Sequence, residues 1–355
     1  MKIGFAIGSL NYSGAEKIAR YLIAALNEQK QEVGIILLGG EGPYEEFDYC
    51  KQYVIKTSGN RYLRTLKRQQ KIRAVVNSEH YDVVVSFGVK YNLDVMEALN
   101  HTKTRVILCE RNDPVNDPHR KILRIRRKLI YKKAAGFVFQ TDRIAEFFGK
   151  KIAARGTVIP NFVEERLPYL YNENAENNIV LTARLDDRQK NISMLLRAFK
   201  TFTDTHDYKL YLVGSGPDEQ KFKDYVMQNR LNGKVVFTGR QNSYDYLKIA
   251  KIFVLPSYYE GMPNSLIESL ATGIPSISTD CSGGGAAYLI KDHENGTLIP
   301  VDGENELVEA LKELADNAEL RKKYSTEAYK LNDRLEFNKI IDMWISYIKE
   351  IANKK

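Results

Sequence analysis

Two glutamates in the second half of the chain, Glu260 and Glu268, have a type and a spacing that could do chemistry. An apolar run at 252–255 predicts a buried strand, and a helix is expected to begin near Asn264 after a turn. Backbone N–H groups at a helix start lack partners within the helix and carry partial positive charge, so they can bind a phosphate. A carboxylate beside them can bind sugar hydroxyls or stabilise the cationic carbon of a sugar that loses its leaving group. The pattern therefore indicates a nucleotide-sugar site.

The segment from Pro256 to Pro275 resembles the E-x7-E element of the retaining glycosyltransferases of family 4, which have the GT-B fold. The resemblance is carried by Pro-Ser, Glu-Gly-x-Pro, the second glutamate and Ala-x-Gly-x-Pro, in that order. It extends over both halves of the chain and is closer in the second half. It implies that Glu260 lies beside the transferred sugar and that Glu268 binds ribose hydroxyls. Without it, the same segment would be read as a solvated loop with two surface carboxylates.

Cations are needed where the nucleotide diphosphate departs, because negative charge grows on its oxygens. The sequence contains no Asp-x-Asp motif of the kind that holds a metal for this purpose. Arg184 and Lys190 resemble the arginine and lysine that follow the first strand of the second domain in the family, and both suit phosphate. Arg188 could take the place given to Lys190. The predicted catalytic residues are Arg184, Lys190 and Glu260, with no metal and no cofactor beside the UDP-sugar co-substrate.

The resemblance also implies contacts to the donor and to the acceptor. The donor contacts would come from glycine turns, a base-contacting segment and the loop before the helix: Gly14, Gly214, Gly239, Arg240, Gly261, Met262, Pro263, Asn264, Ser265, Leu266 and Glu268. The acceptor contacts would come from the first loop and from the end of a strand near residue 110: Ser13, Glu110, Arg111 and Asn112. A plain turn closed by Pro114 is the alternative for the second group. The sequence departs from the family at Ser13, which replaces a glycine, and at Tyr288, which replaces a glutamate.

The fold class is predicted to be α/β, with two Rossmann-like doubly wound domains and a cleft between them. A chain of 355 residues is long enough for two such cores. Continuous apolar strands separated by helices indicate parallel sheets covered on both faces. The expected divisions are 1–170, 171–335 and a last helix at 336–355. The resemblance implies that the first domain binds the acceptor, that the second binds the nucleotide-sugar, and that the last helix crosses back to the first domain. Strands are expected at 3–7, 33–38, 82–87, 105–109, 136–139, 157–159, 179–183, 209–213, 235–238, 252–255 and 276–278.

The net charge of +8 is concentrated in two segments, 61–73 and 118–133, which contain no acidic residue. Both carry apolar residues at roughly helical spacing, which is typical of a helix that lies on an anionic bilayer. The alternative is a solvated face with its apolar side in the core. The sequence offers no nucleic-acid module, no membrane-spanning run and no cysteine pairing. We therefore expect a cytoplasmic protein that is peripheral on the inner face of the cell membrane.

Together these features predict a retaining, metal-independent glycosyltransferase. It would move a hexose or N-acetylhexosamine from a UDP-sugar to a growing, polyprenyl-diphosphate-linked glycan in surface polysaccharide or capsule synthesis. One alternative is another GT-B enzyme such as a UDP-sugar epimerase. The other is a non-catalytic accessory subunit that binds a sugar nucleotide.

Overall fold

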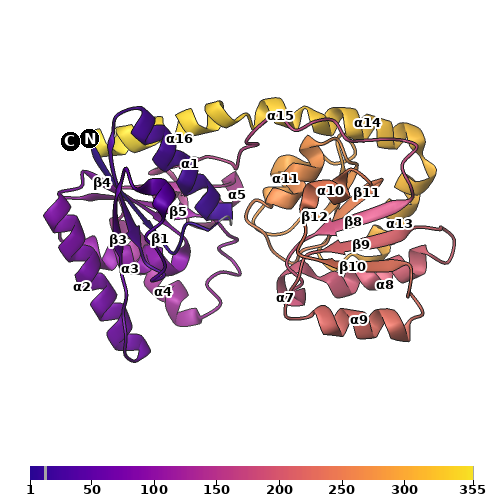
Figure 1. Ribbon diagram of the computed structural model, residues 1–355, viewed down its shortest axis with the longest axis horizontal. Coiled ribbons are helices and arrows are strands. Elements are labelled where there is room, and N and C mark those ends of the chain that lie inside the picture. The colour runs from indigo at the N-terminus through magenta and orange to yellow at the C-terminus, as the bar shows by residue number, and fades with distance from the viewer. Residues whose placement is uncertain (12–13, 355) are drawn as a thin grey trace. The chain divides into compact units, whose positions relative to one another are not determined.

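The computed structural model describes residues 1–11 and 14–354, which form two α/β units (Figure 1). The first unit comprises Met1–Asn161 together with the chain from Asn338 onward, and the second comprises Phe162–Phe337. Each unit has its own parallel sheet with helices packed on it. This confirms the predicted fold class of two Rossmann-like domains.

The first unit is built on seven parallel strands in the spatial order β3-β2-β1-β4-β5-β6-β7. The strand order reverses between β1 and β4, and ligands bind at the carboxyl edge of such sheets. The strands are β1 (Lys2–Ile7), β2 (Glu32–Leu37), β3 (Lys51–Val54), β4 (Val83–Phe87), β5 (Arg105–Glu110), β6 (Gly136–Phe139) and β7 (Gly156–Val158). The helices are α1 (Gly14–Glu28), α2 (Arg61–Glu79), α3 (Val89–Leu99), α4 (Lys121–Ile130), α5 (Asp142–Phe147), α6 (Lys150–Ala153) and α16 (Phe337–Asn353), with 3-10 turns η1 (Glu45–Phe47) and η2 (Tyr131–Lys133).

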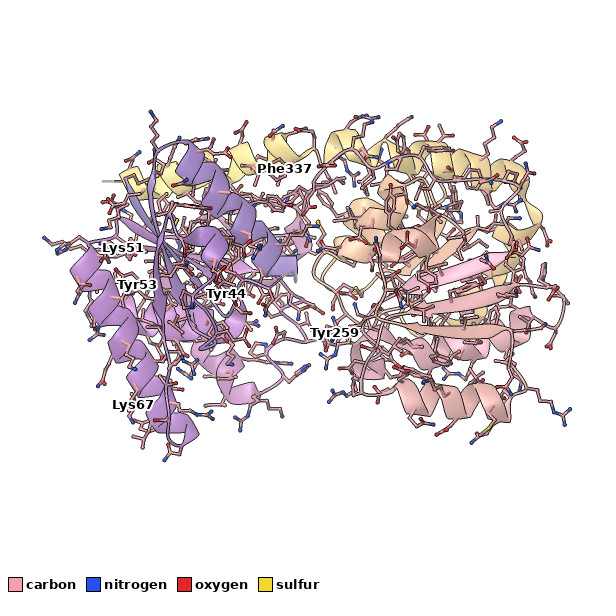
Figure 2. The ribbon with its side chains drawn as sticks, in the orientation of Figure 1. Tyr44, Lys51, Tyr53, Lys67, Tyr259 and Phe337 are labelled. Atoms are coloured by element: carbon pink, nitrogen blue, oxygen red, sulfur yellow. The ribbon has the colours of Figure 1, made fainter. Side chains whose placement is uncertain are left out.

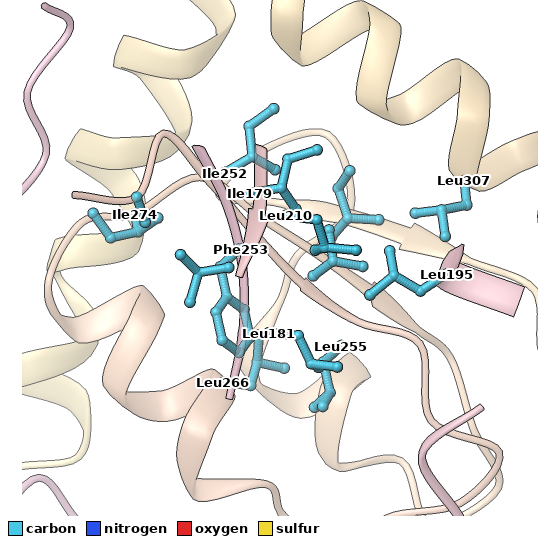
Figure 3. Close-up of a cluster of buried hydrophobic side chains, with 14 of the residues drawn as sticks. Ile179, Leu181, Leu195, Leu210, Ile252, Phe253, Leu255, Leu266, Ile274 and Leu307 are labelled. Carbon is cyan, nitrogen blue, oxygen red and sulfur yellow. The ribbon is translucent and has the colours of Figure 1, made fainter. Parts of the chain in front are cut away.

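The second unit is built on six parallel strands in the order β10-β9-β8-β11-β12-β13. They are β8 (Asn178–Thr182), β9 (Lys209–Val213), β10 (Val235–Gly239), β11 (Ile252–Leu255), β12 (Ser276–Thr279) and β13 (Thr297–Ile299). The helices are α7 (Asp187–Lys190), α8 (Ile192–Phe202), α9 (Glu219–Gln228), α10 (Ser243–Leu247), α11 (Asn264–Ala271), α12 (Gly285–Leu289), α13 (Glu304–Asp316), α14 (Ala318–Tyr329) and α15 (Leu331–Arg334). Buried side chains of β8, β9 and β11 meet those of α8 and α11 in one core (Figure 3).

Hydrophobic patterning explains why the central strands form where they do. In β4 the run Val83-Val84-Val85 is completely buried, and β11 is buried along its whole length. Strands covered by helices on both faces favour such continuous β-branched and apolar runs over alternation. The carboxyl end of β11 leads directly into the loop that carries Glu260.

The chain leaves the first unit after Asn161, which is earlier than the expected division at 170/171. The reason is that the intervening segment is bonded to the second unit. The Val163 N–H donates to the Leu335 carbonyl at 2.8 Å, and the Leu170 N–H donates to the Thr272 carbonyl at 2.8 Å. The ring of Phe162 also packs edge-on against Phe337, at 5.0 Å between ring centres (Figure 2). The polar stretch at 171–177 is therefore a loop of the second unit, and Asn178 begins β8.

The last helix, α16, packs on the first unit. Trp344 is fully buried and stacks on Phe87 with ring centres 5.8 Å apart. The Tyr347 hydroxyl accepts a hydrogen bond from the Phe137 N–H at 2.9 Å and donates to the Arg155 carbonyl at 2.7 Å. Through these contacts the end of the chain completes the core that the first half began.

Several elements differ from the sequence-based prediction. Strands β3 and β13 were not predicted, because each is short and lies at the edge of its sheet, where burial leaves little apolar pattern. Helices α13 and α14 are separated at Asn317, whose side chain accepts a hydrogen bond from the Leu320 N–H at 2.9 Å and caps α14. Asn317 is therefore both the last capping residue of α13 and the first capping residue of α14.

Candidate active site

A nearly buried ion pair joins two loops at the carboxyl edge of the second sheet. Lys190 is the last residue of α7, and its Nζ contacts Oε1 of Glu260 in the loop after β11. The Ser257 hydroxyl donates to the same oxygen at 2.7 Å. The two charged side chains are only 14% and 10% exposed, so water screens their attraction weakly. The structure therefore brings together two of the three residues predicted to be catalytic.

Backbone contacts fix the loop of Lys190 against the loop of Glu260. The Tyr258 N–H donates to the Gln189 carbonyl at 2.8 Å. In return the Gln189 side chain donates to the carbonyl of Tyr259 at 3.3 Å. Tyr259 is labelled in Figure 2. Asn191 then takes a left-handed conformation, with φ of 49°, and ends the short helix α7. The ion pair is thus held by main-chain geometry as well as by its charges.

The two arginines near this pair are arranged differently from Lys190. Arg184 is 67% exposed, and its Nη2 lies 3.8 Å from Oδ2 of Asp186. Arg188 is 82% exposed and donates to both carboxylate oxygens of Asp186, at 3.2 and 3.3 Å. The bond from Arg188 holds the pKa of the Asp186 carboxyl below its usual value. Arg188 is therefore bonded to Asp186, and Lys190 is the cation that contacts Glu260.

Glu268 lies on α11, and its carboxylate contacts the start of α10, the helix that follows β10. The Ser243 hydroxyl, at the start of α10, donates to Oε2 of Glu268 at 2.8 Å. Gly239 ends β10 and Arg240 begins the loop before α10, where the Arg240 Nε donates to the Ser215 hydroxyl at 3.0 Å. The structure thereby places the predicted ribose-binding carboxylate next to the predicted base-contacting segment.

Two predicted glycines stand where no side chain would fit or where the backbone favours glycine. At Gly214, with φ of +145°, a Cβ would lie 1.9 Å from the Ala183 carbonyl oxygen. The Gly214 N–H donates to the carbonyl of Gly239 at 2.9 Å, and Gly239 has φ of +69°. The ends of β8, β9 and β10 consequently touch through their backbones, next to Ala183, which precedes Arg184.

The loop before α11 is buried, whereas the first residues of the helix are partly exposed. Gly261, Met262, Pro263 and Leu266 are buried, whereas Asn264 and Ser265 are half-exposed. Gly285, which was not among the predicted site residues, also shapes this loop. A Cβ there would lie 1.9 Å from the Gly261 carbonyl oxygen, so the glycine-rich turn at 283–285 packs directly on this loop. The three consecutive glycines were the available signal. Tyr288, where the family usually has glutamate, instead packs its ring 5.1 Å from the Arg334 guanidinium.

The residues predicted to meet the acceptor belong to the first unit, and Gly14 begins helix α1 there. Ser13 lies outside the described residues. Glu110 ends β5 and is buried, with hydrogen bonds from the Tyr131 hydroxyl and, at 3.2 Å, from the Asn92 amide. Burial raises the pKa of the Glu110 carboxyl to about 7, although the neighbouring Arg127 opposes this shift. In this structure the Glu110 carboxylate is bonded to internal partners.

Arg111 and Asn112 follow Glu110 and are half-buried. The Arg111 Nη2 donates to Oδ1 of Asn161, and its guanidinium lies 5.9 Å from the Trp344 ring. Its Nε and Nη1 are buried and have no hydrogen-bond partner within the described residues, and burial lowers the pKa of this guanidinium to about 10. Asn112 donates to Asp117 at 3.3 Å. Arg111 therefore has two donor atoms that a ligand could use, at the carboxyl edge of the first sheet.

Comparison with known proteins agrees with this arrangement. The family model described as Glycosyltransferase Family 4 matches residues 12–167, and the model described as Glycosyl transferases group 1 matches residues 165–331. An α-1,4-N-acetyl-D-galactosaminyltransferase of Campylobacter jejuni, named for an undecaprenol-diphosphate-linked substrate, is 29% identical and is covered over 99% of both chains. A second Campylobacter jejuni N-acetylgalactosaminyltransferase is 27% identical over 92% of this chain and 93% of its own.

Solved structures share the fold at lower sequence identity. The apo lipopolysaccharide outer core galactosyltransferase WaaB has a TM-score of 0.80 at 19% identity, with 99% of both chains covered. HepE of Anabaena, solved with UDP, has a TM-score of 0.80 at 16% identity, with 99% of this chain and 100% of that chain covered. Since the two family models together span nearly the whole chain, the protein belongs to the glycosyltransferases, with a family 4 first half and a group 1 second half.

The buried carboxyl of Glu110 predicts a pH-dependent stability of the first unit. Its pKa is about 7 in the folded protein and 4.5 when unperturbed, so it stabilises the fold fully below about pH 4.5 and loses this contribution as pH rises to 7. Relative to Glu110→Gln, the free energy of unfolding of the wild type should fall by about 3 kcal/mol over this range. Urea titrations followed by fluorescence of Trp344, the only tryptophan, measure it. Glu146→Gln, which changes an exposed glutamate, is the control. If the free energy of unfolding changed equally with pH in the wild type and in Glu110→Gln, the raised pKa of Glu110 would be contradicted.

Proposed function

We propose that the protein transfers a sugar from a UDP-sugar to an acceptor hydroxyl with retention of configuration and without a metal ion. The observation that carries the proposal is the Lys190–Glu260 pair, held beside the start of α11. Together with the start of α11 it supplies a fixed cation, a fixed carboxylate and the partial positive charge of a helix N-terminus in one place. Those are the groups that a nucleotide diphosphate with a sugar on its end requires.

The cations have complementary tasks in this proposal. Lys190 is fixed and shielded, so it would stabilise the developing charge on the leaving phosphate without rearrangement. Arg184 is exposed and only loosely paired, so its planar fork is able to close on the diphosphate when the donor binds. Arg188, bonded through both oxygens of Asp186, is less free to do so. Gly214 and Gly239 let the backbone approach the nucleotide, and Glu268 would bind the ribose.

Glu260 has one carboxylate oxygen available for the sugar. Its Oε1 contacts Lys190 and Ser257, whereas Oε2 accepts no hydrogen bond from the part of the chain that the structure describes. An ionised carboxylate oxygen of this kind accepts hydrogen bonds from sugar hydroxyls. In the reaction the bond from the anomeric carbon to the phosphate oxygen breaks, and a bond to the acceptor oxygen forms on the same face. The acceptor proton passes to the departing phosphate oxygen.

The donor and acceptor classes are inferred from relatives. HepE was solved with UDP and glucose, and the pneumococcal transferase GtfA with UDP and GlcNAc, which supports a UDP-hexose or UDP-N-acetylhexosamine donor. The two Campylobacter relatives are named for undecaprenol-diphosphate-linked glycans, which supports a polyprenyl-diphosphate acceptor in surface glycan synthesis. Arg111, whose Nε and Nη1 are buried and have no hydrogen-bond partner among residues 1–11 and 14–354, is the favoured acceptor contact of the first unit.

Such an acceptor lies in a membrane, and the first unit carries a surface suited to one. Three apolar side chains of α4, Ile122, Ile125 and Leu129, are between 57% and 60% exposed and alternate with cations. Tyr62 and Leu63 on α2 are also exposed, and the same helix carries basic residues such as Lys67, which is labelled in Figure 2. Leu123 and Ile130 are turned partly inward, so a core-facing stripe explains only part of the apolar content of α4. Among the described helices, none is both long and apolar enough to cross a membrane. We infer peripheral contact on the cytoplasmic face.

The transferase proposal predicts acceptor-dependent release of UDP in the presence of chelator. Wild-type protein is assayed with UDP-hexoses and UDP-N-acetylhexosamines and a polyprenyl-diphosphate glycan. In Glu260→Gln, kcat should fall by about 100-fold or more, since a preorganised polar group at the reacting centre is worth this much. Glu294→Gln, an exposed glutamate of the same unit, is the matched control.

Each other outcome has a defined meaning. Full activity of Glu260→Gln would remove that carboxylate from the mechanism. Turnover of the UDP-sugar without acceptor would favour an epimerase, and binding of UDP without any release would favour the accessory subunit. Circular dichroism of each variant separates loss of turnover from loss of fold.

The membrane contact predicts a selective loss of vesicle binding. The triple variant Ile122→Ser, Ile125→Ser and Leu129→Ser should bind vesicles that contain anionic phospholipid at least about 10-fold more weakly. The reason is that moving each apolar side chain from water into the bilayer lowers the free energy of the bound state. Sedimentation with vesicles measures the partition. The triple variant Met227→Ser, Ile249→Ser and Val301→Ser removes exposed apolar side chains of the second unit and should bind as the wild type does. Equal losses in both triples would contradict the assigned surface.

A further inference from the structure

A pocket of about 310 Å³ lies among α2, α3 and α4 of the first unit. These helices are neighbours, with α3 in contact with both of the others. Four basic side chains line the pocket: Arg64 and Arg68 from α2, Lys90 from α3 and Arg126 from α4. The basic segments 61–73 and 118–133 both contribute cations to this pocket, and Lys90 lies between them in the sequence.

The charges in this pocket are not balanced. Arg68 pairs with Asp94 at 2.7 Å, and Arg126 pairs with Glu97 at 2.6 Å. Arg64 and Lys90 have no ion pair with any acid in the described part of the chain. In addition, the Nε of Arg68 is buried without a hydrogen-bond partner among the described residues. Within the described residues the pocket therefore has two positive charges without an ion-pair partner and one buried donor without an acceptor, which favour an anion with more than one negative charge.

The geometry of the donors favours phosphate over a single carboxylate. Guanidinium groups present paired N–H donors that match two oxygens of one phosphate, and an ammonium adds a point charge. Arg64, Arg68 and Lys90 come from two helices and could contact different oxygens of the same group. A phosphate monoester or a diphosphate carries the charge needed to offset Arg64 and Lys90 together.

Apolar side chains on the same helices indicate what is attached to that anion. Leu93 and Leu123 line the pocket. Next to Leu123 on α4, Ile122 and Ile125 are exposed, and on α2 Leu63 and Leu66 flank Arg64 and are also exposed. An anion with a hydrocarbon chain would satisfy both features, because its head would enter the pocket while its chain contacts these side chains.

We propose that this pocket binds the phosphate head of a membrane lipid. The shared chemistry is a phosphate or diphosphate ester on a hydrocarbon chain, which either an anionic phospholipid or a polyprenyl-diphosphate acceptor would supply. The inference rests on the proposed membrane contact, but it does not require that sugar transfer occurs. Binding is therefore measured without any donor, so that failure of the pocket and failure of the transferase proposal are separate results.

The first test uses inorganic pyrophosphate and calorimetry on the full chain. The wild type should bind it, and Arg64→Gln with Lys90→Gln should lose at least about 10-fold in affinity, which corresponds to about 1.4 kcal/mol. The control, Lys150→Gln with Lys151→Gln, removes two exposed charges from α6 of the same unit and should change affinity less than about 2-fold. Absence of wild-type binding, or equal losses in the two double variants, would overturn the pocket.

The second test identifies the source of the phosphate. Neutral phosphatidylcholine vesicles are prepared alone, with phosphatidylglycerol, or with undecaprenyl diphosphate. If the pocket variant binds more weakly than the control variant only on phosphatidylglycerol, the ligand is a phospholipid head. If the difference arises on undecaprenyl diphosphate, the pocket holds the acceptor head. The same binding by both variants on every vesicle would overturn the lipid assignment even if pyrophosphate binds.

Discussion

The contact between Lys190 and Glu260 is the interaction on which the candidate site depends. A cation and a carboxylate that are both nearly buried cost free energy to desolvate, and they persist only where other bonds support them. Here Ser257 bonds to the carboxylate, and the backbone bond from Tyr258 to Gln189 holds the two loops together. The pair is thus fixed before a ligand arrives. A fixed charge that needs no rearrangement is more effective at a leaving group than one that must be recruited.

The rest of the second unit can be understood as the support for that pair. Buried strands β8 and β11 bring the two loops to the same edge of the sheet, since neighbouring parallel strands end side by side. Gly214 and Gly285 allow backbones to approach to distances that any Cβ would prevent. Ser243 then places Glu268 next to the loop after β10. The first unit supplies a different set of groups: the unpaired donors of Arg111, and the cations and exposed apolar side chains of α2 and α4.

The sequence predicted the parts of this architecture that leave a local pattern. Continuous apolar runs such as the one at 252–255 identified the central strands, and the spacing of Glu260, Glu268 and their prolines identified the loop that carries the site. Arg188 and Lys190 could not be separated by sequence, because only the fold shows that Asp186 bonds to Arg188. The inward bonding of Glu110 was also missed, since the last residue of a strand can face either the core or the solvent. The contributions of Ser243 and Ser257 depend on contacts distant in sequence, so no local signal reports them. For Gly285 the run of three glycines marked a special backbone position but did not show that it packs on the loop of Gly261.

The most direct test of the central claim is the affinity of UDP, measured by calorimetry in buffer that contains chelator, for the wild type, for Lys190→Met and for Arg184→Gln. The account predicts that the wild type binds UDP without any divalent ion and that each substitution weakens binding by about 10-fold or more, the scale of a charge-assisted phosphate contact. Binding that appears only after magnesium or manganese is added, or variants that bind UDP as tightly as the wild type, would contradict it.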